Sequence, residues 1–180
     1  MNINLSLNIT NEELKILEKK LINKEFKTLE KLIESFDQNK FSHPAVKIIY
    51  ANTKILKPNP NLNEKKIAFN LFLEVYKSNP NFVQALYNAS AICFEIKKYN
   101  RILIVLENYI KINKYNKKIY EALYKIHATI GNIESTIKYL KIILENEPKN
   151  LDAWSAFLFS TLYLEKYTQN DYIKYCKKYY

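Results

Sequence analysis

Residues that could do acid–base, nucleophilic or metal chemistry are few and scattered along the chain. The histidines, His43 and His127, have no carboxylate or cysteine at the spacing that metal ligands need. Ser155 has no nearby histidine to activate its hydroxyl. Cys93 and Cys176 are too few for a disulfide framework, and we expect reduced thiols. This pattern predicts neither a catalytic centre nor a metal site and favours a protein that acts by binding.

The paired carboxylates also fit structural positions. Glu12 and Glu13 are typical of the first turn of a helix, where the helix dipole favours negative charge. Glu145 and Glu147 are interpreted as solvated residues near a helix end. None of these pairs indicates acid–base catalysis.

Glycine is almost absent from the sequence. Gly131 is the only one in 180 residues, whereas about 7% is usual. Turns between strands need glycine often, so we expect no β-sheet. Dinucleotide fingerprints and phosphate-binding loops need several glycines at close spacing, so we expect no cofactor. The 48% hydrophobic content still suffices for the core of one domain or one short solenoid.

The net charge of +10 has two interpretations. Lysines could give weak binding of nucleic acid or an anionic membrane by releasing counterions. However, Arg101 is the only arginine, and tight phosphate clamping or base recognition favours arginine. The favoured interpretation is a solvated surface, shaped by the Asn, Ile, Lys and Tyr content that an AT-rich genome imposes.

The N-terminal segment, Met1 to Thr10, has no positive region followed by an apolar run. The longest apolar stretch elsewhere is Ile102 to Leu106, too short to span a bilayer. We therefore expect a cytoplasmic protein without a transmembrane segment.

Helix breaks recur with a fixed period. Pro80 and Pro148 lie 68 residues apart, which is twice 34, and a polar stretch around Lys114 occupies the position between them. Proline stops a helix because it lacks the amide donor and clashes with the preceding turn. A period of 34 residues is typical of repeated helix pairs.

Similar side chains occupy the same phase of each repeat, at spacings of three and four that place them on one helical face. The first helices carry Leu86, Tyr120 and Trp154, then Ala89, Leu123 and Phe157. The second helices carry Ala68, Ile102 and Thr136, then Phe72, Leu106 and Leu140, then Val75, Tyr109 and Ile143. Each pair thus has an apolar stripe that it cannot cover alone, and we expect the next pair to cover it.

Turn and cap residues share the same phase. Gly131 falls between two helices of a pair, where positive φ is common. Asn100 and Asn132 lie at or beside the starts of second helices, where a short polar side chain can cap free amides. Ser42 is expected to cap a helix that has Pro44 in its first turn.

The first part of the chain follows the frame with one insertion. The run 58–63, Pro-Asn-Pro-Asn-Leu-Asn, is expected to be non-helical and adds about six residues to a turn. Segments 11–21 and 25–36 are expected to form two more amphipathic helices. The predicted organisation is a divergent N-terminal pair (1–42), three repeats (43–80, 81–114 and 115–148) and C-terminal capping helices (149–180).

The repeats resemble the tetratricopeptide family, most clearly over residues 81–148. Small residues of the family motif are replaced here: Ser90 and Tyr124 stand where glycine is common, and Ile102 and Thr136 where alanine is common. The resemblance implies an all-α fold, a right-handed superhelix of about five antiparallel helix pairs.

The last thirty residues are similar to another segment. Ser155, Leu158, Phe159 and Tyr163 match the Ser-x-x-Leu-Phe-x-x-x-Tyr pattern that precedes the catalytic part of SPINDLY-type O-linked N-acetylglucosamine transferases. This similarity implies an acceptor-recognition region without its catalytic domain, or one piece of a split or truncated glycosyltransferase. The alternative is a purely structural capping helix.

The predicted function is a scaffold that binds a partner protein or peptide in a groove, and not an enzyme. In stacked pairs the first helices line the concave face, so their outward residues should meet the partner. These residues are Gln84, Tyr87, Asn88, Ala91, Glu95, Lys118, Glu121, Lys125, Thr129, Asp152 and Ser155. Asn88 is notable because its amide can pair with both N–H and C=O of an extended peptide. Ala122 and Ala156, at the equivalent positions, lack that amide.

Overall fold

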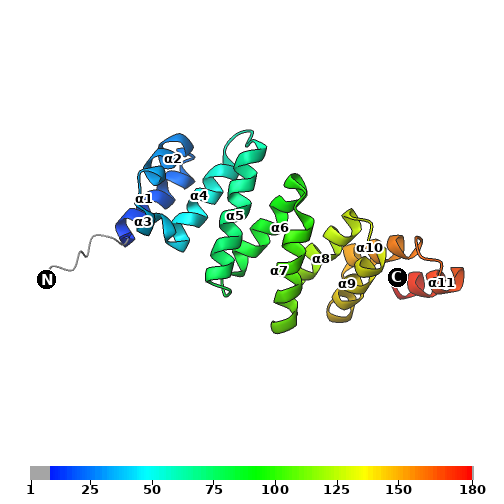
Figure 1. The fold of residues 1–180 in the computed structure, drawn as a ribbon. Helices are drawn as coiled ribbons and strands as arrows, with labels where there is room; N and C mark the ends of the chain where they lie inside the picture. Colours follow the sequence, from blue (N-terminus) through cyan, green and yellow to red (C-terminus); the bar gives the residue numbers. More distant parts are fainter. Residues whose placement is uncertain (1–8, 180) are drawn as a thin grey trace. The chain divides into compact units, whose positions relative to one another are not determined.

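The structure is a computed structural model that describes residues 9–179, and these residues form eleven helices and no strand (Figure 1). None of these helices has the length and apolar content needed to cross a membrane. The helices are α1 (Asn11–Ile22), α2 (Phe26–Glu34), α3 (Gln38–Ser42), α4 (Pro44–Leu56), α5 (Leu62–Ser78), α6 (Val83–Ile96), α7 (Tyr99–Ile112), α8 (Lys117–Thr129), α9 (Ile133–Asn146), α10 (Leu151–Thr161) and α11 (Gln169–Tyr179).

The helices form two compact units, Met1–Lys97 and Lys98–Tyr180. In the first unit α5 packs against both α4 and α6, and α4 also contacts α1 and α2. In the second unit α9 packs against both α8 and α10. Helices α5 and α9 are therefore each covered by the helix that precedes them and the helix that follows them in the chain. The repeat boundaries inferred from the sequence stay a prediction.

The apolar positions of the 34-residue frame are confirmed as core. Leu86, Leu123, Ile102 and Leu106 are fully buried, and Trp154 is 6% exposed. The other positions of the frame are buried as well, except Tyr120, which is half-buried. The spacing of apolar residues along the sequence determines which side chains share a helical face, so the sequence identified the buried stripe correctly.

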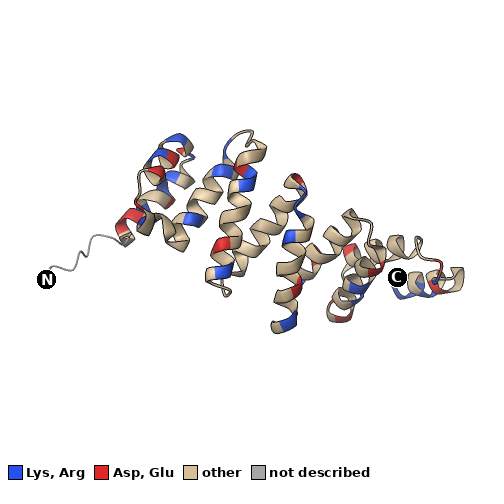
Figure 2. Cartoon of the chain, viewed as in Figure 1, with Lys and Arg blue, Asp and Glu red and all other residues tan. Residues whose placement is uncertain are grey.

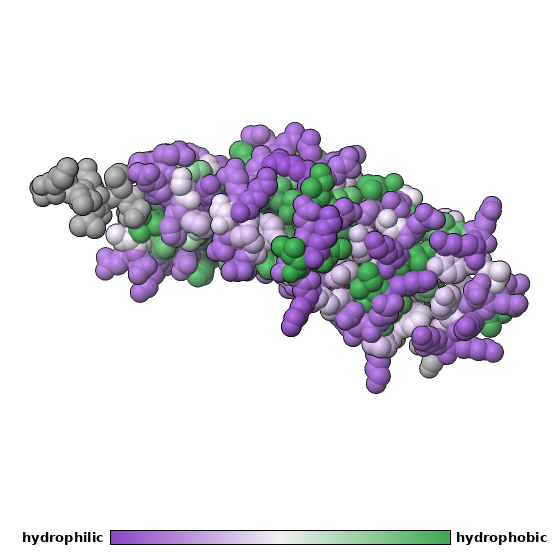
Figure 3. Space-filling view, turned by 60° about the horizontal axis from the view of Figure 1, so that its bottom comes forward, coloured by the Kyte–Doolittle hydropathy of each residue, from purple (hydrophilic) through white to green (hydrophobic). Residues whose placement is uncertain are grey.

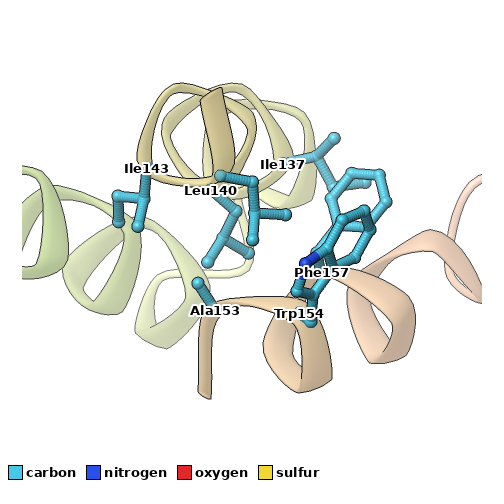
Figure 4. Packing of buried hydrophobic residues seen from close by; sticks show 7 residues of the cluster. Ile137, Leu140, Ile143, Ala153, Trp154 and Phe157 are labelled. Atoms are coloured by element: carbon cyan, nitrogen blue, oxygen red, sulfur yellow. The ribbon is translucent and has the colours of Figure 1, made fainter. Parts of the chain in front are cut away.

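In the second unit the stripes of α9 and α10 meet in one cluster (Figure 4). Ile137 and Leu140 of α9 face Trp154 and Phe157 of α10. The Trp154 indole N–H donates a hydrogen bond of 2.8 Å to the carbonyl of Pro148, so the ring is buried without losing its polar partner. Burying each large side chain contributes about 1.5–3 kcal/mol, so this contact holds α10 against α9.

The first unit has an equivalent cluster at its N-terminal end. Leu17 of α1, Leu29 and Ile33 of α2, and Val46 and Ile49 of α4 are buried against one another. The two helices expected over segments 11–21 and 25–36 are thus present, although the second ends at Glu34. The short helix α3 was not predicted.

The start of α9 agrees with the sequence, whereas the starts of α4, α5 and α7 differ from it in part or in full. Asn132 caps α9 by accepting a hydrogen bond of 3.1 Å from the Ser135 amide, as expected. The expectation for Ser42 is wrong: Ser42 ends α3, and the His43 ring accepts from the Ala45 amide at the start of α4. Asn100 lies beside the start of α7, as expected, but its side chain does not cap the helix. Helix α5 begins at Leu62, inside the run 58–63 that was expected to be non-helical.

Gly131 lies in the turn between α8 and α9 at φ +78°, the left-handed region, and no atom lies within 4 Å of where a Cβ would be. We expect Gly131→Ala to destabilise the protein by about 1 kcal/mol through backbone strain alone. Gly131→Asn should cost less, because asparagine tolerates this conformation better. Urea unfolding of the three proteins measures the difference, and equal losses for Ala and Asn would contradict this explanation.

Candidate interaction surface

The predicted groove residues of the first unit lie on α6. Gln84, Ala91 and Glu95 are exposed, whereas Tyr87 and Asn88 are half-buried. The Gln84 amide donates a hydrogen bond of 2.9 Å to the Asn88 amide oxygen, one helical turn away. Glu95 forms an ion pair with Lys65 of α5. The face therefore presents one amide pair with donors still available for a ligand.

The predicted residues of the second unit lie on α8 and α10. Lys118, Lys125 and Thr129 of α8 and Asp152 and Ser155 of α10 are exposed. The Thr129 hydroxyl donates to the carbonyl of Lys125 at 2.7 Å, so it is bonded to its own helix. The remaining residue, Glu121, is half-buried.

Tyr124 connects the charged residues of the two helices. Burial raises the pKa of its hydroxyl, and the negative charges of Glu121 and then Asp152 raise it further. The Tyr124 side chain also packs against the apolar cluster of α9 and α10. Lys125 lies over the Tyr124 ring, with its ammonium 5.8 Å from the ring centre, where a cation is attracted to the π face. We call Glu121, Tyr124, Lys125, Asp152 and Ser155 the α8–α10 face.

Sequence reasoning missed one group beside this face. The Tyr115 hydroxyl donates a hydrogen bond of 3.0 Å to Glu147, and Lys117 pairs with the same carboxylate at 2.8 Å. The hydrogen bond from Lys117 is the main cause that lowers the pKa of Glu147. Glu147 lies at the end of α9, as expected, but it is half-buried and paired with both groups, so it is less solvated than the sequence indicated. Spacing along the sequence gives no signal for this group, because Tyr115 and Glu147 are 32 residues apart.

Residues of the α8–α10 face combine both signs of charge with a tyrosine and a hydroxyl. Lys117 and Lys125 each lie 4.0 Å from Glu121, from one turn before and one turn after it. Exposed ion pairs at such distances contribute little to stability, so these groups remain available to exchange partners. The arrangement can bind an extended chain through charge pairs and hydrogen bonds. In the part of the chain that the structure describes, no three potential metal ligands form a group.

Comparisons with known proteins identify the fold. A structure of MamA aligns with a TM-score of 0.71 at 15% identity, over 92% of this chain and 87% of that one. MamA residues 41 to the end from Desulfovibrio magneticus RS-1 give 0.66 at 17% identity, over 92% and 88%. YrrB, described as a TPR protein with an unusual peptide-binding site, gives 0.69 at 12% identity, over 92% and 82%. The fold is that of a tetratricopeptide solenoid.

Sequence comparisons give no further assignment. No protein-family model matches the chain, and no curated protein matches it either. At 12–18% identity the structural matches establish the fold of the solenoid and nothing about its ligand.

Three exposed apolar side chains of the second unit lie together at the end of α10, while others, such as Ile104 and Ile112, lie elsewhere on this unit. Phe159 and Tyr163 are about 60% exposed and pack edge to face at 5.2 Å, and Leu162 beside them is also exposed. Figure 3 shows that the hydrophobic patches on the face in view are surrounded by hydrophilic side chains. Of the residues that match the glycosyltransferase pattern, Leu158 is buried, while Ser155, Phe159 and Tyr163 are exposed.

The two buried reactive groups of the solenoid are in surroundings that suppress ionisation. Burial raises the pKa of the Cys93 thiol to about 12, so it is not a ready nucleophile. His127 is 6% exposed, and neither ring nitrogen has a hydrogen-bond partner among the described residues. The ring stacks on Tyr139 at 5.5 Å, and the Glu107 carboxylate lies 3.8 Å from Nε2.

His127 should make stability depend on pH. Burial lowers the pKa of its imidazole, Glu107 opposes this shift and Lys138 adds to it. The unfolded chain therefore takes up a proton more readily than the folded one. Stability is complete above the unfolded pKa of about 6.5 and falls as the pH drops below it, with a slope of at most about 1.4 kcal/mol per pH unit.

Urea unfolding between pH 7.5 and 5.5 tests this dependence. We expect His127→Phe, which keeps the stacking on Tyr139, to flatten the slope. His43→Asn is the control, because asparagine can replace the cap that His43 provides for α4. A slope that disappears with His43→Asn and persists with His127→Phe would refute the assignment.

Proposed function

We propose that this protein is a scaffold that binds another protein or a peptide, and that it does so without catalysis. The observation that carries the proposal is the α8–α10 face, where Lys125 lies both over the Tyr124 ring and 4.0 Å from Glu121, and Tyr124 packs against the apolar cluster of α9 and α10. Groups of opposite charge around an aromatic ring suit a polypeptide, which offers backbone amides, carbonyls and charged side chains together.

The face on α6 extends the proposal to the first unit. Asn88 accepts a hydrogen bond from Gln84, which leaves its own NH₂ group free to donate to a peptide carbonyl. Tyr87 beside it offers an amphipathic ring of the kind enriched at protein interfaces. A peptide site in this fold is also consistent with YrrB, whose description names one.

A relation to SPINDLY-type glycosyltransferases is a finer proposal. It is supported by the pattern at Ser155, Leu158, Phe159 and Tyr163, and by the loop and helix α11 that follow it in the same order as in that family. In this form of the proposal the solenoid presents an acceptor polypeptide to a catalytic domain that these 180 residues do not contain.

Binding of nucleic acid or an anionic membrane through lysines is less favoured. Lysines and acidic residues are interspersed over the helices of both units (Figure 2). Many lysines are also paired, as Lys54 is with Glu30 at 3.1 Å and Lys117 with Glu147 at 2.8 Å. Phosphate arrays favour a continuous basic stripe.

A charge exchange on the α8–α10 face tests the scaffold. Lys125→Glu combined with Asp152→Lys reverses two charges and keeps the net charge constant. We expect this variant to capture at least about tenfold less of a partner that the wild type retains from native lysate. Like charges that face each other across an interface disfavour a specific complex. Quantitative mass spectrometry of the captured proteins measures the loss.

The matched control exchanges Lys138→Glu and Glu145→Lys, two exposed residues of α9 outside this face. It should capture the same partner as the wild type. If the face variant and the wild type retain identical sets of proteins in equal amounts, the face does not bind the partner. If both variants lose the partner equally, the effect is not specific to the face.

A further inference from the structure

A pocket of the first unit lies away from the α6 face, at the turns of the helix pairs. It has a volume of about 870 Å³ and is lined by the turn between α1 and α2 and by the loop between α4 and α5. In Figure 1 these two turns lie at the same end of the unit. The volume is within the range of about 300–1,000 Å³ that is usual for small-molecule sites.

The loop between α4 and α5, residues 57–61, contains most of the insertion seen in the sequence, and it builds one wall of the pocket. Pro58 and Asn59 lie on that wall. The loop ends in a capping box: the Asn61 side chain accepts from the Glu64 amide at 3.0 Å, and Glu64 accepts from the Asn61 amide at 2.8 Å. The insertion thus forms a fixed wall and not only a longer connection.

All carboxylates that line the pocket already have cationic partners. Glu25 pairs with Lys20 at 2.7 Å, and Glu30 pairs with Lys54 at 3.1 Å and with Lys57 at 3.3 Å. Lys57 also pairs with the remaining carboxylate, Glu64. A ligand therefore gains little by presenting a positive charge here.

The lysines at the mouth of the pocket are in the opposite situation. Lys24 and Lys27 line it, are exposed, and have ammonium groups without an ion pair or hydrogen bond in the part of the chain that the structure describes. Thr28 adds an unbonded hydroxyl, while Phe26 and Pro58 add apolar surface. The free polar groups can all donate hydrogen bonds, which suits an anion.

We infer that this pocket binds a small organic anion, with its phosphate or carboxylate on Lys24 and Lys27 and its apolar body against Phe26 and Pro58. The site would be separate from the surface proposed for polypeptides, since it shares no residue with the α6 and α8–α10 faces. Its ligand would thus bind whether or not a polypeptide partner is present.

Titration of the full chain with phenyl phosphate and with benzoate, followed by NMR of backbone amides, tests the inference. We expect saturable shifts at residues 24–28 and 57–61 with at least one of the two anions, and the one that binds more tightly identifies the head group. Lys24→Gln combined with Lys27→Gln should weaken binding about tenfold, because charge-assisted hydrogen bonds are lost. Lys31→Gln combined with Lys66→Gln removes the same charge outside the pocket and should change affinity less than about twofold.

Three outcomes would overturn the inference. The first is the absence of saturable shifts with both anions, and the second is equal weakening by the two pairs of substitutions, which indicates diffuse attraction only. The third is binding of inorganic phosphate as tight as that of phenyl phosphate, which excludes a role for the apolar body. Folding of each variant is checked by the same spectra, since the amides outside the pocket should keep their positions.

Discussion

Each helix pair in this protein has an apolar stripe that only its neighbour can shield from water. The contact between α9 and α10 shows the constraint directly: Leu140 and Ile143 on one helix are buried together with Trp154 and Phe157 on the other. Neither helix is long enough to be stable alone in water, so packing supplies most of the stability of both. The hydrophobic period of the sequence therefore has to be kept, whereas the residues between the stripes can vary.

This division of roles explains where binding groups can occur. The outward faces of first helices and the turns at the ends of pairs do not contribute to the stripe, so they can carry charges and hydroxyls at little cost to folding. The α8–α10 face lies on the outward faces of first helices, and the pocket beside Lys24 and Pro58 lies at the turns. The polypeptide surface and the anion pocket can consequently change in sequence without altering the fold.

The sequence predicted the helices and the buried positions well, because both follow from spacing along one chain. It could not predict contacts between distant residues: Glu147 meets Tyr115 across 32 residues, and Lys57 meets Glu30 across 27. Nor did it predict that His127 is buried without a hydrogen-bond partner. The candidate surface was predicted only as a set of outward positions, and Tyr124 was recognised from its packing against the cluster of α9 and α10.

Hydrogen exchange of the α9 amides in a Phe157→Ala variant tests most directly whether one pair depends on the next. Truncating this buried ring in α10 should cost about 3–5 kcal/mol. If α9 relies on α10, protection of the amides around Leu140 should fall by a comparable free energy although no residue of α9 has changed. Unaltered protection in α9, with exchange faster only within α10 and α11, would show that the pairs are independently stable and would contradict this account.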